Sequence, residues 1–399
     1  MNIISLLIPI CTALLISSCS KESISAEPNC DSRGCTTSVE LVGTYSPQTI
    51  SQIIASSGVN VSMLGELTYS VDLNRVVYRT IDALGNEVEA SGVILVPRNT
   101  NHIPMLSIQH GAVFHRNNVC SESILNGGEG LVGMLMASKG YGVVIPDYLG
   151  YGVSEMIHPY LNEQLSASVT IDAIRSARHH IQSQGVSLID QLFLYGYSEG
   201  GYVTLATQKV IETDYSDEFS LTAVAPMAGP YDLEGTLSRL FEERNYDHLP
   251  NLAFVLTSFD AVNNWGKLDH MFKAPYNQLV TDLFSGNHNN DEIRSALPNN
   301  LPELIREEFI VDFLTGQESE VSLAFSNNSL LNWSPVAPVR LYHGDLDEEV
   351  PFHNAQTALD RLKANGGNVE LFTIQGADHQ TANVPSVLAM IEWFETLRL

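Results

Sequence analysis

The strongest chemical signal in the sequence is the stretch Gly196-Tyr197-Ser198-Glu199-Gly200. It follows an apolar segment that predicts a strand, and it opens a segment with helical periodicity. A serine at so sharp a turn needs glycines two positions away, because larger side chains would clash there. The turn lifts the hydroxyl above the sheet, and the following helix aims backbone N–H groups at it. We therefore predict that Ser198 is a nucleophile.

A serine hydroxyl is a weak nucleophile at neutral pH, so it needs a base and an acid that orients the base. One predicted strand ends shortly before Asp345 and Asp347, and the next ends shortly before Asp378 and His379. Both loops follow the carboxyl end of a strand, where open α/β sheets bind ligands. His379 is the predicted base, and the first two aspartates are the candidate acids. We expect Glu348-Glu349 to be solvated loop carboxylates.

The oxyanion formed in acyl transfer needs two N–H donors. One predicted donor is the backbone N–H of Glu199, the residue after the nucleophile. The second should come from His110-Gly111-Ala112, which follows a predicted strand at Met105–Gln109. Within this loop, Ala112 is the preferred donor and Val113 is the alternative.

Strand-like and helix-like segments alternate from about residue 66 to the C-terminus. Two strands joined by a turn are predicted at Leu67–Thr80 and Glu87–Val96. Short apolar runs then predict the buried strands of a largely parallel sheet flanked by helices. These runs are Met105–Gln109, Gly142–Ile145, Gln191–Tyr195, Leu221–Pro226, Val339–Tyr342 and Val369–Ile374.

About a hundred residues interrupt this alternation without a convincing strand. They contain short amphipathic helices, for example one predicted at Leu301–Leu314. We therefore expect a helical cap at residues 231–335, inserted between two core segments at residues 41–230 and 336–399.

With these motifs in this order, the chain resembles the α/β-hydrolase superfamily over about residues 67–399. Within it the layout is similar to the secretory-lipase type of esterase, which carries a helical cap before the acid-bearing strand. The H-G-x-x-D-x-x-V-P pattern of such hydrolases puts the acid at Asp347, and Asp147–Ser154 looks like their architectural D-x-x-G-x-G-x-S loop. The resemblance implies a carboxylic ester hydrolase with catalytic Ser198, Asp347 and His379. This chemistry needs no metal and no organic cofactor.

The cap has more apolar side chains than its own core requires. We expect some of them to line an acyl pocket for lipid-like or medium-chain esters. The candidates are Leu237, Leu240, Phe241, Phe254, Leu256, Phe259, Trp265, Met271, Phe272 and Phe284.

Two alternative functions stay open. A peptidase or amidase can use the same fold and triad, because esters and amides share the acyl-transfer mechanism. A surface lipoprotein could also use a hydrolase-like body only to bind a ligand. The presence of Ser, Asp and His in the expected order argues against the second alternative.

The N-terminus predicts export. Residues 1–18 carry no charged side chain, and the apolar run Ile3–Ile16 is short for a membrane span, so we predict that residues 1–18 are a signal peptide. It leads into Ile16-Ser17-Ser18-Cys19, which resembles a bacterial lipobox and implies lipid attachment at Cys19. We expect an exported cell-envelope lipoprotein, at the outer membrane or surface, with a polar tether at residues 19–40. Ordinary secretion and an uncleaved anchor are the alternatives.

The amino-acid composition limits the classes of binding partner that we expect. Acidic residues outnumber basic ones 46 to 20, for a formal net charge of −26. Such a chain repels phosphate backbones, so nucleic acid is not an expected partner, whereas an ester substrate and a membrane are. Cys30 and Cys35 flank a turn-forming spacer and could pair in an oxidising compartment. Cys120 is either a free buried thiol or the partner of one of them.

Overall fold

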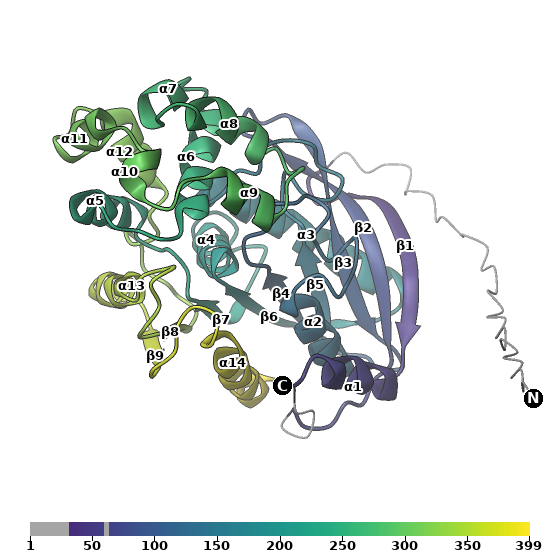
Figure 1. The fold of residues 1–399 in the computed structure, drawn as a ribbon. Coiled ribbons are helices and arrows are strands. Elements are labelled where there is room, and N and C mark those ends of the chain that lie inside the picture. Colours follow the sequence, from purple (N-terminus) through teal and green to yellow (C-terminus); the bar gives the residue numbers. More distant parts are fainter. Residues whose placement is uncertain (1–31, 60–63) are drawn as a thin grey trace, which may run out of the picture.

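The computed structural model describes residues 32–59 and 64–399 (Figure 1). The predicted signal peptide, the predicted lipid-attachment residue Cys19 and Cys30 lie outside these ranges. Cys35 is disulfide-bonded, whereas Cys120 is a free and buried thiol. Cys120 is therefore not the partner of Cys35. Within the described ranges, no helix combines the length and apolar character that crossing a bilayer requires.

The described part of the chain folds around a nine-stranded sheet with the order β1-β2-β3-β5-β4-β6-β7-β8-β9. Strands β1, β2, β3 and β5 pair antiparallel in that order, and all pairs from β5 to β9 are parallel. The strands are β1 (Thr36–Tyr45), β2 (Val71–Ile81), β3 (Glu87–Pro97), β4 (Ile103–Gln109), β5 (Gly142–Pro146), β6 (Leu188–Tyr197), β7 (Leu221–Met227), β8 (Val339–Gly344) and β9 (Val369–Ile374). The predicted α/β fold with a mostly parallel sheet is confirmed.

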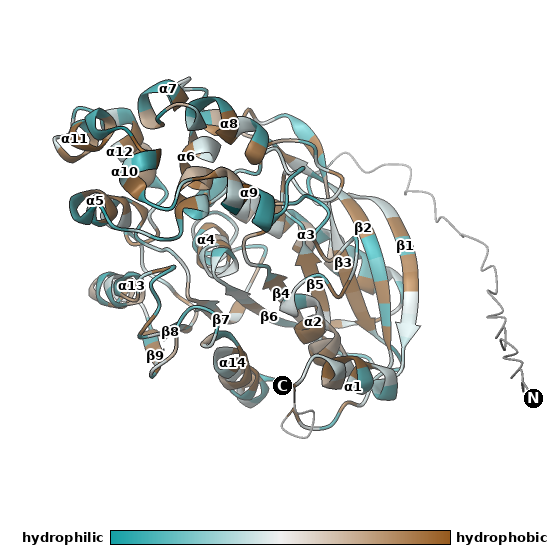
Figure 2. Cartoon of the chain, in the orientation of Figure 1, coloured by the Kyte–Doolittle hydropathy of each residue, from teal (hydrophilic) through white to brown (hydrophobic). Residues whose placement is uncertain are grey.

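Helices cover both faces of the sheet. Along β5, Val144 packs into one apolar cluster while Val143 and Ile145 pack into another, as the alternation of a strand requires. The first cluster includes residues of α3 (Glu163–Ser183), α4 (Glu199–Asp214) and α13 (His353–Ala364). The second includes residues of α1 (Pro47–Ser56), α2 (Gly128–Ser138) and α14 (Asn383–Leu397). Figure 2 shows the central strands as mostly apolar and the outer strand β1 as mixed.

Helices α5 to α12 fill the interval between β7 and β8, where the sequence predicts a cap. They gather on the side of the molecule away from α1 and α14 (Figure 1). They are α5 (Leu233–Glu243), α6 (Leu249–Asn263), α7 (Leu268–Met271), α8 (Tyr276–Leu283), α9 (Asn290–Ala296), α10 (Leu301–Leu304), α11 (Glu307–Leu314) and α12 (Ser319–Asn327).

Two predictions about elements are wrong. The single helix expected at Leu301–Leu314 is divided, because Ile305 adopts an extended conformation and forms a β-bridge with Phe272. The tether expected at residues 19–40 ends before Thr36, where β1 begins and pairs with β2. β1 escaped prediction because it is an edge strand interrupted by register shifts, with no buried side chain to mark it.

Candidate active site

Ser198 occupies the strained turn that the sequence predicts. It lies between β6 and α4 with φ 59° and ψ −122°, a conformation that L-residues rarely adopt. The neighbouring glycines are required by contact. A Cβ on Gly196 would lie 2.3 Å from the carbonyl oxygen of Gly200, and one on Gly200 would lie 2.1 Å from that of Gln109. The backbone can therefore hold Ser198 in this turn only with glycine at both positions.

The structure brings Ser198, His379 and Asp347 together. His379 Nε2 lies 2.9 Å from Ser198 Oγ, and its Nδ1 lies 2.7 Å from Asp347 Oδ2. The loops after β8 and β9 carry the acid and the imidazole. Tyr197 donates a hydrogen bond from its hydroxyl to the carbonyl oxygen of His379, at 2.6 Å, and so fixes the histidine backbone. This arrangement allows a proton to pass from the hydroxyl to the imidazole.

Asp347 is held by more groups than the sequence indicated. Its Oδ1 accepts from the backbone N–H of Val350 at 2.9 Å, and its Oδ2 lies 3.1 Å from His343 Nε2. Burial alone would raise the pKa of the Asp347 carboxyl, but hydrogen bonds from His343 and His379 outweigh burial and lower this pKa to about 2. The acid is therefore a carboxylate at any physiological pH. Sequence reasoning did not assign His343 this contact, although its spacing of four residues from Asp347 was visible.

The pKa of His379 results from opposing effects. Burial of the ring by itself lowers the pKa. The hydrogen bond to Asp347 and the charges of Asp347, Glu349 and Asp378 outweigh burial and raise it above the ordinary 6.5. His379 is thus a stronger base than an isolated histidine, as a group that must take a proton from serine should be.

The two predicted oxyanion donors have free N–H groups. Among the described residues, the backbone N–H groups of Ala112 and Glu199 have no hydrogen-bond acceptor. The loop that carries Ala112 is fixed by two tyrosines of the Asp147–Ser154 stretch. Tyr148 donates to the carbonyl oxygen of His110 at 3.1 Å, and Tyr151 donates to that of Val113.

His110 fits the role of a residue that fixes this loop. It is buried, stacks on Tyr148 with 4.1 Å between ring centroids, and its ring nitrogens form no hydrogen bond with Ser198. Its ring nitrogens lie 2.7 Å from the carbonyl oxygen of Gly111 and 3.1 Å from that of Asp147. Both contacts are to backbone, so they hold the loop shape.

The side chain of Glu199 makes a contact that sequence reasoning missed. It is fully buried, and its Oε1 lies 2.5 Å from His158 Nε2. His158 Nδ1 lies 2.7 Å from the carbonyl oxygen of Leu149, which can only accept, so Nδ1 carries a hydrogen. A hydrogen bond between Nε2 and Oε1 then needs one further proton, and the pair is neutral overall. The Glu199 carboxyl therefore adds no net negative charge behind the predicted oxyanion donors.

A cavity of about 660 Å³ opens onto Ser198, His379 and Ala112. None of the ten cap residues expected to line an acyl pocket contributes to it. That expectation is wrong because nine of the ten side chains, all but Leu240, pack in or against the large apolar cluster that the cap shares with the first face of the sheet. Leu237 and Leu240 also line a separate cavity of about 70 Å³.

The structure also corrects the expectation for Glu349. This side chain is only partly exposed, lines the cavity, and accepts from Asn251 Nδ2 at 3.1 Å. It is held by the cap and is not freely solvated, whereas Glu348 is exposed as expected. Asp345, the rejected acid, accepts from the backbone N–H of Gly376 at 2.6 Å and stabilises a turn.

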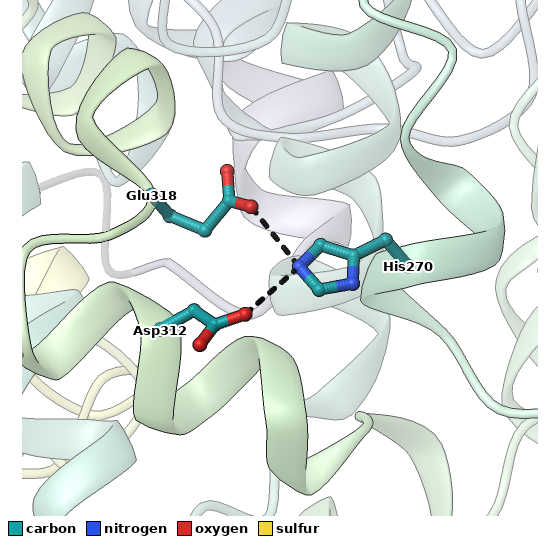
Figure 3. A group of neighbouring side chains, drawn as sticks. All are labelled: His270, Asp312 and Glu318. Carbon is teal, nitrogen blue, oxygen red and sulfur yellow. Dashed lines mark ion pairs between the residues drawn. The ribbon is translucent and has the colours of Figure 1, made fainter.

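Another charged cluster lies within the cap (Figure 3). His270 Nε2 lies 3.0 Å from Glu318 Oε1 and 3.5 Å from Asp312 Oδ2. The ammonium of Lys267 donates to Glu318 at 2.7 Å and supplies a compensating positive charge. These residues do not line the cavity beside Ser198. The cluster connects α7, α11 and the start of α12.

The comparisons with known proteins agree with this geometry. A family model described as secretory lipase matches residues 123–398. This chain belongs to the secretory lipase family. A secreted triacylglycerol lipase of Malassezia furfur is 20% identical over 358 residues, which cover 83% of this chain and 71% of that protein.

Solved structures place this secretory lipase family member among esterases and lipases. A ligand-bound rice cell wall degrading esterase of Xanthomonas oryzae is 28% identical with a TM-score of 0.81, covering 92% of this chain and 98% of that one. Candida antarctica lipase A in its closed state has a TM-score of 0.68 and covers 94% of this chain and 85% of its own. Because the two sequences are only 15% identical, this likeness shows the fold alone. The chain is a carboxylic ester hydrolase with an α/β-hydrolase fold.

Proposed function

We propose that this chain hydrolyses esters through an acyl-enzyme formed on Ser198. The observation that supports this most directly is the hydrogen-bonded series from Ser198 Oγ through His379 to Asp347. Ser198 Oγ attacks the acyl carbon while His379 Nε2 takes its proton. The bond to the alcohol oxygen then breaks, and His379 returns the proton to the leaving alcohol. Water attacks the acyl-enzyme with the same help and releases the acid.

Charge is stabilised at two points along this path. The carboxylate of Asp347 fixes the imidazole tautomer and stabilises the imidazolium. The N–H groups of Ala112 and Glu199 bind the oxyanion, and loss of one such donor costs about 3 kcal/mol of activation free energy. Val113 remains the alternative donor on the same loop. No step of this path calls on a metal or an organic cofactor.

A fluorophosphonate probe tests the proposal, because it labels only an activated serine. We expect covalent labelling and hydrolysis of p-nitrophenyl esters by the native chain, and the loss of both in Ser198→Ala. Aminoacyl anilides assayed alongside separate the alternatives. Anilide cleavage with negligible ester cleavage would indicate a peptidase or amidase, and absence of labelling would indicate a binding protein.

We further propose that the mature protein is an exported lipoprotein whose Cys19 is acylated. The short apolar leader and the Ile16-Ser17-Ser18-Cys19 sequence support this. The Malassezia relative is described as secreted, which fits export. Lipid-like esters are the proposed substrates, since that relative is described as a triacylglycerol lipase.

A further inference from the structure

We propose that the acyl chain of the ester lies between α1, α2 and α14, on the side away from the cap, and that the alcohol part faces the cap. This rests on the proposed ester hydrolysis and adds the direction in which the substrate binds. It replaces the expectation that the cap holds the acyl chain.

One end of the cavity is apolar. Its lining there comes from helices that cover the second face of the sheet. The side chains are Ile54, Val132, Leu135, Val387, Leu388 and Ile391. All of them belong to, or pack against, the apolar cluster on that face. An alkyl chain placed there exchanges water for hydrocarbon contacts along its length.

The other end of the cavity is polar and belongs mostly to the cap. Apart from Pro250, the cap contributes only polar or charged side chains, from α6, α9 and the residue before α6. They are His248, Asn251, Asn290 and Arg294. An alkyl chain against these groups would remove their water without replacing its hydrogen bonds, whereas an alcohol with further hydroxyls could replace them.

Helix α2 shows the same change of polarity along its length. Its first turn carries Glu129, whose Oε1 accepts from the backbone N–H of Gly111 at 3.3 Å, beside the oxyanion loop. Val132 and Leu135, one and two turns further along, line the apolar end. A chain that starts at Ser198 therefore meets increasingly apolar surface as it moves along α2.

Among the described residues, the apolar side chains of the cap pack mainly against one another and against the core. Aromatic side chains of the cap pack against one another. For example, the rings of Phe254 and Phe284 stack with a centroid distance of 4.8 Å. The small cap cavity of about 70 Å³ is roughly a tenth of the main one. Ligand sites for molecules of moderate size usually exceed about 300 Å³, which the main cavity does and the cap cavity does not.

The experiment measures kcat/KM for p-nitrophenyl acetate, butyrate and octanoate. In the native chain we expect a rise of up to about fourfold per added methylene as the chain fills the apolar end. Leu388→Trp and Val132→Trp place an indole in that end at partly buried positions. Each variant should lower kcat/KM for octanoate at least tenfold and should change kcat/KM for acetate less than threefold. Leu388→Ala should instead raise kcat/KM for octanoate relative to kcat/KM for butyrate.

Two matched controls complete the design. Glu392→Trp adds an indole one helical turn beyond Leu388, at an exposed position that does not line the cavity, and should leave all three rates unchanged. Arg294→Trp fills the polar end and should leave the octanoate-to-acetate ratio unchanged. If Arg294→Trp lowers that ratio, or if the variants at 388 leave it unchanged, the proposed direction is wrong. If the native chain hydrolyses none of the three esters, the proposed function itself fails.

Discussion

At the residue scale, Asp347 shows how one carboxylate organises a site. It contacts two histidines and one backbone N–H, and these contacts lower its pKa to about 2 despite burial. The ion then raises the pKa of His379 against the effect of burial on the ring. In the proposed mechanism, the strength of the base thus depends on a carboxylate that contacts the ring nitrogen of His379 opposite Ser198.

The pH dependence of kcat/KM should depend on the contact between Asp347 and His379. In the proposed mechanism His379 acts as a base and must be neutral, so kcat/KM should fall as the pH drops through the pKa of His379, with a midpoint above 6.5 because this pKa is raised. Asp347→Asn removes the charge that raises the pKa. It should move the midpoint to lower pH and reduce kcat by about 10⁴-fold. A pH series on p-nitrophenyl butyrate measures both effects.

Asp345→Asn is the matched control. Asp345 lies on the same loop, but it accepts from Gly376 in a turn and has no contact with His379. Its replacement should leave the rate and the midpoint within a factor of about two. Equal effects of the two substitutions would mean that neither carboxylate orients the base.

Gly200 tests the geometry of the serine turn. A Cβ there would lie 2.1 Å from the carbonyl oxygen of Gln109, a backbone atom that cannot move without shifting β4. Gly200→Ala should therefore cost about 1–3 kcal/mol of unfolding free energy and lower the rate, because Ser198 moves with the turn. Gly128→Ala is the control, since a Cβ at that position meets no neighbour. Thermal unfolding followed by circular dichroism compares the two, and an unchanged melting temperature in Gly200→Ala would contradict the prediction.

At the element scale, the buried pair of Glu199 and His158 connects three elements. Glu199 is the first residue of α4. His158 contacts the carbonyl oxygen of Leu149, which lies in the Asp147–Ser154 loop. The carbonyl oxygen of His158 accepts from Ser258 Oγ of α6 at 2.8 Å. The serine turn, the loop that supports the oxyanion donors and a cap helix are thereby held in one network.

Breaking this pair from one side should be costly. His158→Ala leaves the Glu199 carboxyl buried without a partner, and we expect a loss of about 3–5 kcal/mol of unfolding free energy. Glu199→Gln should cost less, because its amide can donate to a neutral imidazole. Chemical denaturation of both variants measures the difference. A larger loss in Glu199→Gln than in His158→Ala would show that the two residues do not act as a pair.

At the scale of the whole molecule, the helices on the two faces of the sheet pack against different parts of the structure. The helices of the first face join the cap in one apolar cluster, and the helices of the second face border the cavity. The cap therefore shares an apolar cluster with the core on one side and presents mostly polar side chains to the cavity on the other. Within the described residues, Pro250 is the only apolar side chain that the cap contributes to the lining of the cavity.

Attachment to a membrane also belongs to this scale. If Cys19 is acylated, the native chain should sediment with membranes of a bacterial host that processes lipoproteins, and detergent should release it. Cys19→Ser should remain active on p-nitrophenyl butyrate but lose the acyl chains. Partition into Triton X-114 separates the two forms, and equal partition of both would mean that the chain is not lipidated at this residue.

The sequence alone determined the features whose causes are local. The turn at Ser198 needs glycine within two residues, and the loops with Asp347 and His379 follow apolar runs of strand length, so spacing and order were sufficient. The alternation of apolar runs and helical segments likewise predicted the mostly parallel sheet. Only the tertiary structure decided the edge strand β1, the partner of the Glu199 side chain, the contacts of Asp347 with His343 and Val350, and the apolar end of the cavity. These depend on which distant side chains meet when the helices pack, and no local pattern in the chain encodes those contacts.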